Sequence, residues 1–344
     1  MVFSFGGKFM LVLKDNYKPT LSMRDTQKAI KVVRDTFEDN LALRLNLERI
    51  SAPLFVTKNS GINDDLNGVE RAVSFDVKEM QDAGDVVIVH SLAKWKRIAL
   101  KKYGFSSGEG FYTDMNAIRR DEDMDNLHSI YVDQWDWEKV VNKEDRNVDY
   151  LKNTVSNIIN ALVDTLETVK EKFPEIKTDF TRDVYFITTQ ELEDMYPDLT
   201  AKEREKAITK EKQIVFLMQI GGKLKSGKPH DGRAPDYDDW SLNGDILVYS
   251  DVLEDVIEIS SMGIRVDAET LDSQLKIADK NERREFDYHK QILNGTLPLT
   301  IGGGIGQSRV CMLLLGKLHI GEVQASLWSD DMIKKCAEKN VNLL

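Results

Sequence analysis

Residues 301–309, Ile301-Gly302-Gly303-Gly304-Ile305-Gly306-Gln307-Ser308-Arg309, lead directly into the apolar run Val310–Leu315. Glycines let a ligand approach the backbone closely, and a helix that starts after them favours anions. The alternative is that the glycines only let a strand pack tightly against a helix, with Arg309 in a surface ion pair.

Two common phosphate motifs do not fit this stretch. The third glycine of a dinucleotide fingerprint would fall at Gln307, and no Gly-Lys-Ser or Gly-Lys-Thr follows as in a P-loop. Phosphate binding would therefore use side chains as well as the loop.

Composition indicates a globular enzyme-sized chain. Its 344 residues are 41% hydrophobic and 31% charged, which allows a large core but is too polar for a membrane-embedded protein. The net charge of -11 favours small-molecule ligands over nucleic acid. No segment reaches membrane length, so we expect no membrane partner. Cys311 and Cys336 are too few for a disulfide framework or metal cluster, which predicts a reducing, cytoplasmic location.

Helical spacing of apolar residues predicts two long core helices. In the first, from about Ser22 to Asn46, the apolar face consists of Ile30, Val33, Phe37, Leu41 and Leu45. The second extends from about Asp149 to Lys172. Between them, residues 47–54 are typical of a strand closed by Pro53.

Three further segments have clear patterns. Residues 85–90 predict a strand buried on both faces, after which Ser91 would cap a helix. The cations of that helix, Lys94, Lys96 and Arg97, would lie near the floor of a site. Residues 201–212 are so densely charged that we expect a solvated helix without chemistry.

Polar residues recur in strand-like segments where apolar ones are usual. In residues 131–138, the period of two places Gln134 and Asp136 on one face, which can bind, and Trp135 and Trp137 on the other, which packs. Asp136 could equally serve only to pair with an arginine.

Residues 242–249 and 256–265 predict a hairpin. Glu258 and Arg265 are seven apart, so a shared site requires a bulge near Ser261 to Gly263. If Asp245 and Glu258 meet, their oxygens suit Mg²⁺ that arrives with phosphates. On this segment alone, the pattern fits a solvated pair of acids without a metal equally well.

Two loops combine arginine with acids. Residues 231–240 can orient a zwitterionic ligand, but their composition favours a salt-bridged surface turn. In residues 117–123, an arginine fork matches phosphate oxygens, and a carboxylate can accept from the exocyclic amine of adenine.

Taken in order, these motifs resemble the ammonia-dependent asparagine synthetase family, the bacterial-type aspartate–ammonia ligases. The resemblance rests on Arg-x-Asp-Glu-Asp, Asp-Gln-Trp-Asp-Trp, Glu-x-Ser-Ser-Met-Gly-Ile-Arg and Gly-Gly-Gly-Ile-Gly-Gln-Ser-Arg, with the longer strings His90–Arg97 and Arg233–Trp240. It extends from about Lys14 to the C-terminus. The shorter motifs are also similar to those of class II aminoacyl-tRNA synthetases, aspartyl-type above all.

The resemblance implies an α+β fold with a class II aminoacyl-tRNA synthetase-like catalytic core, in which a mostly antiparallel sheet is flanked by helices. It implies one catalytic domain over residues 1–344, with residues 1–13 as an N-terminal extension, and a homodimer that uses the helix and strand ending at Pro53. Aspartate and Mg-ATP would give β-aspartyl-AMP and pyrophosphate. Ammonia would then displace AMP to yield asparagine.

The family motifs also assign residues to the nucleotide. Arg119 matches the arginine on the α-phosphate, although Arg120 is an alternative because aspartyl-tRNA synthetases place their arginine directly before Asp-Glu-Asp. Arg309 matches the arginine on the outer phosphates. The full set expected at ATP and Mg²⁺ is Arg119, Glu122, Glu258, Gly304, Gly306 and Arg309 for ATP, and Asp245 and Glu258 for the metal.

For the amino acid, Lys96 and Arg265 fit as cations for the aspartate carboxylates, without a fixed pairing. The whole set expected around aspartate is Ser91, Lys96, Gln134, Asp136, Arg233, Asp238, Ser261 and Arg265. Asp64 matches the acid that would bind ammonium and accept its proton, with Asp65 as a neighbour that could be confused with it. Catalysis would then rest on Asp64, Arg119, Gln134 and Arg309.

Two other functions would use the same set of residues. A tRNA synthetase would use the same activation step, but only about forty residues precede the first strand, which predicts no anticodon-binding barrel. A non-catalytic paralogue would keep the pocket and lose a charge, whereas every expected cation and acid is present. The sequence therefore predicts an ATP-dependent, AMP-forming ligase.

Overall fold

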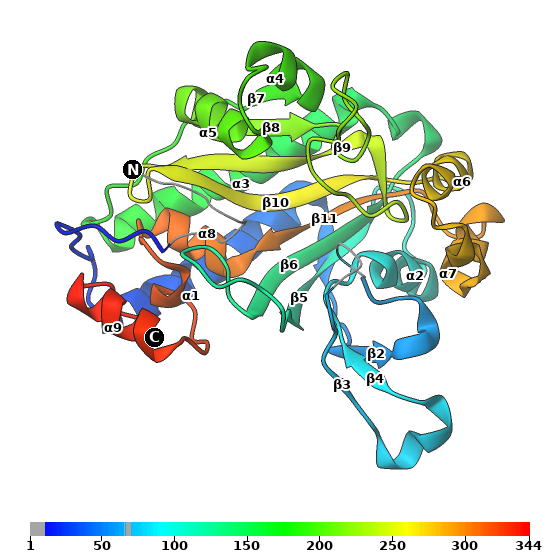
Figure 1. The fold of residues 1–344 in the computed structure, drawn as a ribbon, viewed down its shortest axis with the longest axis horizontal. Coiled ribbons are helices and arrows are strands. Elements are labelled where there is room, and N and C mark those ends of the chain that lie inside the picture. The colour runs from blue at the N-terminus through cyan, green and yellow to red at the C-terminus, as the bar shows by residue number, and fades with distance from the viewer. Residues whose placement is uncertain (1–10, 65, 67–69) are drawn as a thin grey trace.

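The computed structural model describes residues 11–64, 66 and 70–344, and its largest element is an eight-stranded sheet (Figure 1). In spatial order its strands are β1 (Leu47–Arg49), β5 (Gly110–Ile118), β6 (Tyr131–Val140), β11 (Thr300–Gly306), β10 (Asp255–Arg265), β9 (Asp238–Ser250), β8 (Ile214–Met218) and β7 (Tyr185–Thr188). Only the two outer pairs, β1–β5 and β7–β8, are parallel. The expected mostly antiparallel sheet is confirmed.

A second, three-stranded sheet projects from the main body (Figure 1). It contains β2 (Phe55–Thr57), β4 (Val86–Ile88) and β3 (Ser74–Phe75). The strand expected over residues 85–90 is β4, with Val86 and Val87 buried.

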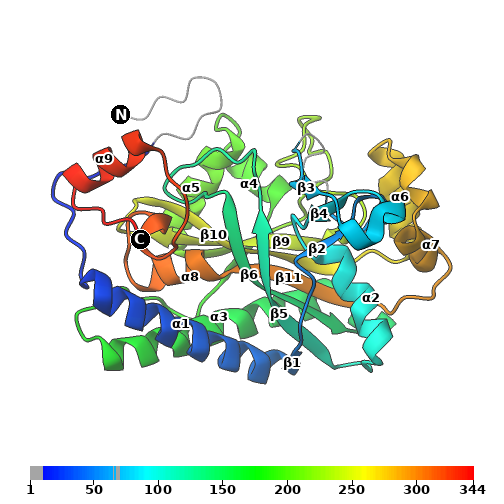
Figure 2. The same ribbon diagram turned by 90° about the horizontal axis from the view of Figure 1, so that it is seen from below.

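Helices α1 (Met23–Leu45) and α3 (Val148–Lys172) lie side by side along one face of the main sheet (Figure 2). Phe37 of α1 packs on Trp135 of β6 with ring centroids 4.6 Å apart, and Trp137 is also fully buried. This packing confirms both the helices and the alternation in β6, whose opposite face therefore carries Gln134 and Asp136.

The remaining helices surround the sheet. They are α2 (Ala93–Tyr103), α4 (Thr189–Met195), α5 (Ala201–Lys212), α6 (Ala268–Ile277), α7 (Asp287–Leu293), α8 (Gln307–Leu314) and α9 (Asp330–Glu338), with 3-10 turns η1 (Lys58–Ser60), η2 (Lys78–Ala83), η3 (Lys143–Asp145), η4 (Asn281–Glu285) and η5 (Ile320–Glu322). Residues 11–13, expected to belong to an extension, pack partly buried against the core. Residues 1–10 and Asp65 lie outside the described residues.

Three local predictions need correction. The strand expected over residues 47–54 is shorter, because β1 ends at Arg49 where the chain leaves the main sheet. Pro53, which lacks an N–H, lies in the connection to β2. The N-cap residue of α2 is Leu92, one position after Ser91. The Ser91 hydroxyl still accepts weakly from the Ala93 amide, at 3.4 Å, but its short hydrogen bond is the one it donates to Asp64 at 2.9 Å. Helix α5 is correct but not wholly solvated, since Arg204 and Glu205 are buried.

His319, at the start of η5, is expected to make stability depend on pH. Its Nδ1 accepts from the Gly321 amide at 3.0 Å, and its Nε2 is buried without a partner among the described residues. Burial lowers the pKa of His319 from 6.5 to about 4. The unfolded chain therefore binds the proton more readily, so stability is complete above pH 6.5 and falls by up to about 3 kcal/mol as the pH approaches 4.

The variant His319→Asn tests this, because asparagine keeps an acceptor for Gly321 and does not titrate. Between pH 7 and 4.5 its free energy of unfolding in urea should fall less than that of the wild type. Parallel curves for the two proteins would contradict the role of His319.

Candidate active site

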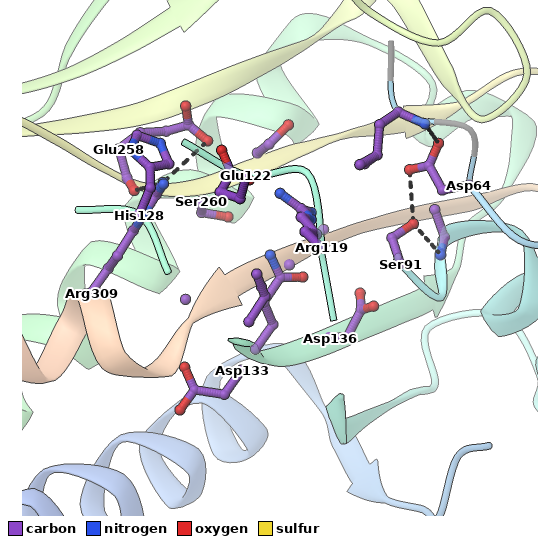
Figure 3. A pocket seen from close by; sticks show the side chains of 18 of the residues that line it. Asp64, Ser91, Arg119, Glu122, His128, Asp133, Asp136, Glu258, Ser260 and Arg309 are labelled. Carbon is purple, nitrogen blue, oxygen red and sulfur yellow. Dashed lines mark hydrogen bonds and ion pairs between the residues drawn. The ribbon is translucent and has the colours of Figure 1, made fainter. Parts of the chain in front are cut away.

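A cavity of about 420 Å³ lies over the middle of the main sheet, on the face opposite α1 and α3 (Figure 3). Its walls come from β6, β10 and β11, from the start of α8, and from loops around residues 119–129 and 232–238. Asp64, Leu66 and Glu70 complete the wall. The volume lies within the range of small-molecule sites, and the wall is dominated by charged and polar side chains.

Nearly all the residues expected at the site meet in this cavity. The lining residues among them are Asp64, Ser91, Lys96, Arg119, Glu122, Gln134, Asp136, Arg233, Asp238, Glu258, Ser261, Arg265, Gly304, Gly306 and Arg309. The exception is Asp245, which lies behind the wall with its Oδ1 2.6 Å from Nη2 of Arg233. The structure brings these fifteen residues together around one cavity, and their individual roles stay predictions.

The cations of α2 divide between the cavity and the core. Lys96 lines the cavity, whereas Lys94 lies 3.5 Å from buried Asp236, and Arg97 donates to the carbonyls of Val266 and Pro298. The prediction that all three would lie near the floor of the site is therefore correct only for Lys96.

The glycines of β11 make room for polar side chains of the neighbouring strand β6. A Cβ at Gly302 would collide with the carboxylate of Glu138, and one at Gly304 would collide with the amide of Gln134. Arg309 lies in the first turn of α8 and does not only form an ion pair at the surface. Its Nη1 donates to the Glu258 carbonyl at 2.9 Å, and its side chain is 24% exposed.

Below the cavity, buried charges form a connected network. Arg265 donates to Glu138 at 2.7 and 3.0 Å and also to Asp238, while Lys96 binds Asp136 and the Gly303 carbonyl. Burial alone would raise the pKa of Glu138, but the charges of Arg265 and Lys96 hold it below its usual value. The network keeps the Glu138 carboxylate ionised and in place.

Of the two candidate arginines, the cavity contains Arg119, whereas Arg120 is exposed. The Arg119 side chain makes a single long hydrogen bond, from Nη2 to the His90 carbonyl at 3.4 Å, and its Nε is buried without a partner among the described residues. In Figure 3 Arg119 extends into the middle of the cavity. Its guanidinium therefore retains donors for an anion.

Glu258 and Arg309 mark one end of the cavity (Figure 3). Their Oε1 and Nη1 atoms are 3.9 Å apart. A bulge in β10 places them there: Glu258 is opposite Leu247 and Ser260 is opposite Ile246, with a second irregularity between Gly263 and Arg265. The bulge expected near Ser261 to Gly263 therefore exists, with one irregularity on each side of that segment.

Asp64 marks the other end and is 5% exposed. Its carboxylate accepts from the Ser91 hydroxyl at 2.9 Å, the Tyr237 hydroxyl at 3.3 Å and the Leu66 amide at 3.0 Å. Burial and the nearby charge of Asp64 raise the pKa of Tyr237 well above 10, so Tyr237 remains a hydrogen-bond donor to this acid.

Residues 231–240 do not form a surface turn, so the interpretation that composition favoured was wrong. Asp236 is fully buried, where it binds Arg283 at 2.8 Å and His289 at 3.0 Å. Burial would raise the pKa of Asp236, but Lys94 and these partners lower it. The anchored loop presents Arg233 and Tyr237 to the cavity.

Three residues that build the site were not predicted from the sequence: Asp133, Glu138 and Tyr237. Glu138 carried a signal, because the alternation that selects Gln134 and Asp136 continues to it two residues later. Tyr237 and Asp133 carried none, since their partners Asp64 and Ser308 lie 173 and 175 positions away.

A family model and individual relatives in known sequences point to the same family. Residues 24–340 match the family model described as AsnA, aspartate-ammonia ligase. An aspartate–ammonia ligase of Clostridium perfringens (strain 13 / Type A) is 60% identical over 334 residues, which is 97% of this chain and 99% of that protein. One from Levilactobacillus brevis is also 60% identical, with the same coverage.

Solved structures with the same fold are class II aminoacyl-tRNA synthetases. The asparaginyl-tRNA synthetase of Pyrococcus horikoshii complexed with asparaginyl-adenylate has a TM-score of 0.62 at 15% identity, over 89% of this chain and 70% of that one. The enzyme from Entamoeba histolytica, also with asparaginyl-adenylate, has a TM-score of 0.60 at 14% identity, and this chain covers 66% of it. In the described residues, no helix is long and apolar enough to cross a membrane.

Proposed function

Because the chain belongs to the aspartate–ammonia ligase family, we propose that it makes L-asparagine from L-aspartate, ATP and ammonia through a β-aspartyl-AMP intermediate. AMP and pyrophosphate would be the other products. The observation that carries the proposal is the single cavity with Arg119 and Arg309 on one part of its wall and Asp64, Ser91 and Asp136 on another (Figure 3).

In the first step, an oxygen of the aspartate β-carboxylate attacks the α-phosphorus of ATP and pyrophosphate leaves. Arg119 stabilises the charge that develops on the α-phosphate, and Arg309 binds the outer phosphates. Glu122 accepts from the adenine amine, and the Gly304 and Gly306 backbone lets the nucleotide approach β11. The remaining donors of Arg119 make this assignment the best supported of the set.

Aspartate binds to the charged and polar side chains on the floor of the cavity. Arg265 and Lys96 supply positive potential for its carboxylates, with Arg233 nearby, and Asp136 and Asp238 suit its ammonium group. The polar frame is completed by Ser91, Gln134 and Ser261. Gln134 extends from the same face of β6 as Asp136 and packs over Gly304 of β11, which supports a place for it in this frame.

In the second step, ammonia attacks the activated carbonyl and AMP leaves. Ammonium cannot attack until it loses a proton, and Asp64 is the carboxylate that accepts it. Its hydrogen bonds from Ser91 and Tyr237 fix its orientation, and its burial keeps competing water away from the acyl group.

Magnesium fits this donor set as an ion that enters with the phosphates. Glu258 in the wall offers hard oxygen atoms, and Mg²⁺ commonly uses one or two carboxylates plus phosphate. Asp245 would be a second ligand only where Arg233 releases it. The ion would neutralise charge on the outer phosphates.

We also propose a cytoplasmic homodimer. Helix α1, which the family resemblance assigns to the interface, exposes the apolar side chain of Leu43 to 83%. Sedimentation equilibrium that gives a single species of 39.3 kDa would contradict the dimer.

Product analysis tests the activity. The purified chain with ATP, Mg²⁺ and aspartate should form asparagine and AMP in equal amounts, only when ammonia is present, and added tRNA should change nothing. Formation of ADP would refute the adenylate route. Aspartylation of tRNA would indicate a synthetase instead.

The variant Asp64→Asn should separate the two steps. Asparagine keeps the shape but accepts no proton, so asparagine formation should fall by roughly 10²- to 10⁴-fold while aspartate-dependent pyrophosphate exchange into ATP is largely kept. Asp85→Asn, on a nearby exposed segment, is the control. Equal loss of both activities would remove Asp64 from the second step.

A further inference from the structure

The carboxylate of Asp133 lies in the wall of the cavity, yet protein donors occupy all its acceptor positions. Its Oδ1 accepts from the Ser308 amide at 3.1 Å and from Gln324 at 3.3 Å, and its Oδ2 accepts from the Ser308 hydroxyl at 2.8 Å and from Arg34 at 2.5 Å. A carboxylate offers about four such positions. Asp133 therefore has no acceptor position left for a substrate or a metal ion, and it must act through the residues that it contacts.

The first of these neighbours is helix α8, which starts without a cap of its own. Its N-cap residue is Gly306, which has no side chain to accept from the first amides. Asp133 supplies that acceptor from β6 by binding the amide and hydroxyl of Ser308. A negative charge is also favourable at the start of a helix. Asp133 thus serves as an external cap of α8.

Arg34 of α1 holds Asp133 in this position. It forms the 2.5 Å ion pair with Asp133, and its guanidinium also lies beside the thiol of Cys311, one turn further along α8. Arg34 is 34% exposed, whereas Asp133 is 4% exposed, so Arg34 provides the charge that compensates a buried carboxylate. The two residues connect α1, β6 and α8.

The residue after Ser308 is Arg309, whose guanidinium marks the phosphate end of the cavity. We propose that Arg34 and Asp133 are positioning residues that fix the first turn of α8 and thereby aim Arg309 at the nucleotide. The inference rests on the proposed function, in which Arg309 binds ATP. Displacement of such a group by about 1 Å can lower a rate by about 10²-fold.

The variants Arg34→Met and Asp133→Asn test this inference. Each should weaken equilibrium binding of Mg-ATP, measured by calorimetry, and lower kcat/KM for ATP by roughly 10- to 100-fold. The KM for aspartate should stay within about two-fold, because its frame lies elsewhere in the cavity. Arg34→Lys keeps the charge and should recover part of the ATP affinity.

Arg44→Met is the matched control. Arg44 also lies on α1, is 30% exposed, and pairs with Asp164 of α3 away from the cavity. Arg44→Met should leave the KM for ATP unchanged, and it should destabilise the protein less than Arg34→Met because Asp164 keeps its ion pair with Arg182. Equal effects of Arg34→Met and Arg44→Met on that KM would overturn the proposal.

A double variant separates positioning from general damage. If Asp133 acts through Arg309, adding Asp133→Asn to Arg309→Ala should weaken ATP binding no further, whereas additive losses would overturn the inference. The two proposals can also fail separately. A wild type that does not bind ATP would refute the proposed function, whereas a wild type that binds ATP together with an Arg34→Met variant of equal affinity would refute only this inference.

Discussion

Arg309→Ala is expected to lower kcat/KM for ATP by about 10²- to 10³-fold, the cost of removing one charge-stabilising donor in a cavity. The side chain lies in the first turn of α8, and its Nη1 donates to the Glu258 carbonyl at 2.9 Å. Alanine is a good helix former, so α8 should persist. AMP release from ATP, aspartate and ammonia measures the effect.

Arg182→Ala is the control for Arg309→Ala. Arg182 is 42% exposed and pairs with Asp164 and Glu167 away from the cavity. It should release AMP at the wild-type rate. Full turnover by Arg309→Ala would show that Arg309 does not bind the phosphates of ATP.

Glu138→Gln is expected to destabilise the protein by about 3–5 kcal/mol, because it leaves buried positive charge without compensation. Glu138 is fully buried and accepts from Arg265 and Thr300, with Lys96 3.5 Å away. Glutamine keeps the shape and one acceptor but not the charge. Urea unfolding at pH 7 gives the free energy.

Asp35→Asn is the comparison for Glu138→Gln. Asp35 pairs with Lys31 on the exposed side of α1, and loss of such a surface pair should leave the urea midpoint unchanged. If Glu138→Gln lowers the free energy of unfolding by less than about 1 kcal/mol, the charge of Glu138 is not needed to hold the buried network together.

Much of the fold followed from local patterns. The 3.6-residue spacing in α1 and α3 and the alternation in β6 predict structure correctly because burial against a single sheet determines both. Where several constraints compete, local pattern fails. Ser91 is a good cap residue, but in the folded chain its hydroxyl binds Asp64, which is 27 positions away.

The membership of the site was also predictable, but its connections were not. Family motifs selected fifteen of the residues that line the cavity. They did not reveal that Asp245 binds Arg233 or that Asp133 caps α8, because both contacts depend on how separate segments meet. The acidic loop at residues 231–240 was misread for the same reason, since its buried partners Arg283 and His289 come from later in the chain.

The β-aspartyl-AMP intermediate is the claim on which the account depends, and isotope transfer tests it most directly. Aspartate labelled with ¹⁸O in its side-chain carboxylate should be incubated with ATP, Mg²⁺ and ammonia, and the products examined by mass spectrometry. We expect one ¹⁸O atom in AMP for each asparagine formed, because the attacking oxygen stays on the α-phosphorus. Unlabelled AMP, or ¹⁸O in inorganic phosphate released with ADP, would contradict it.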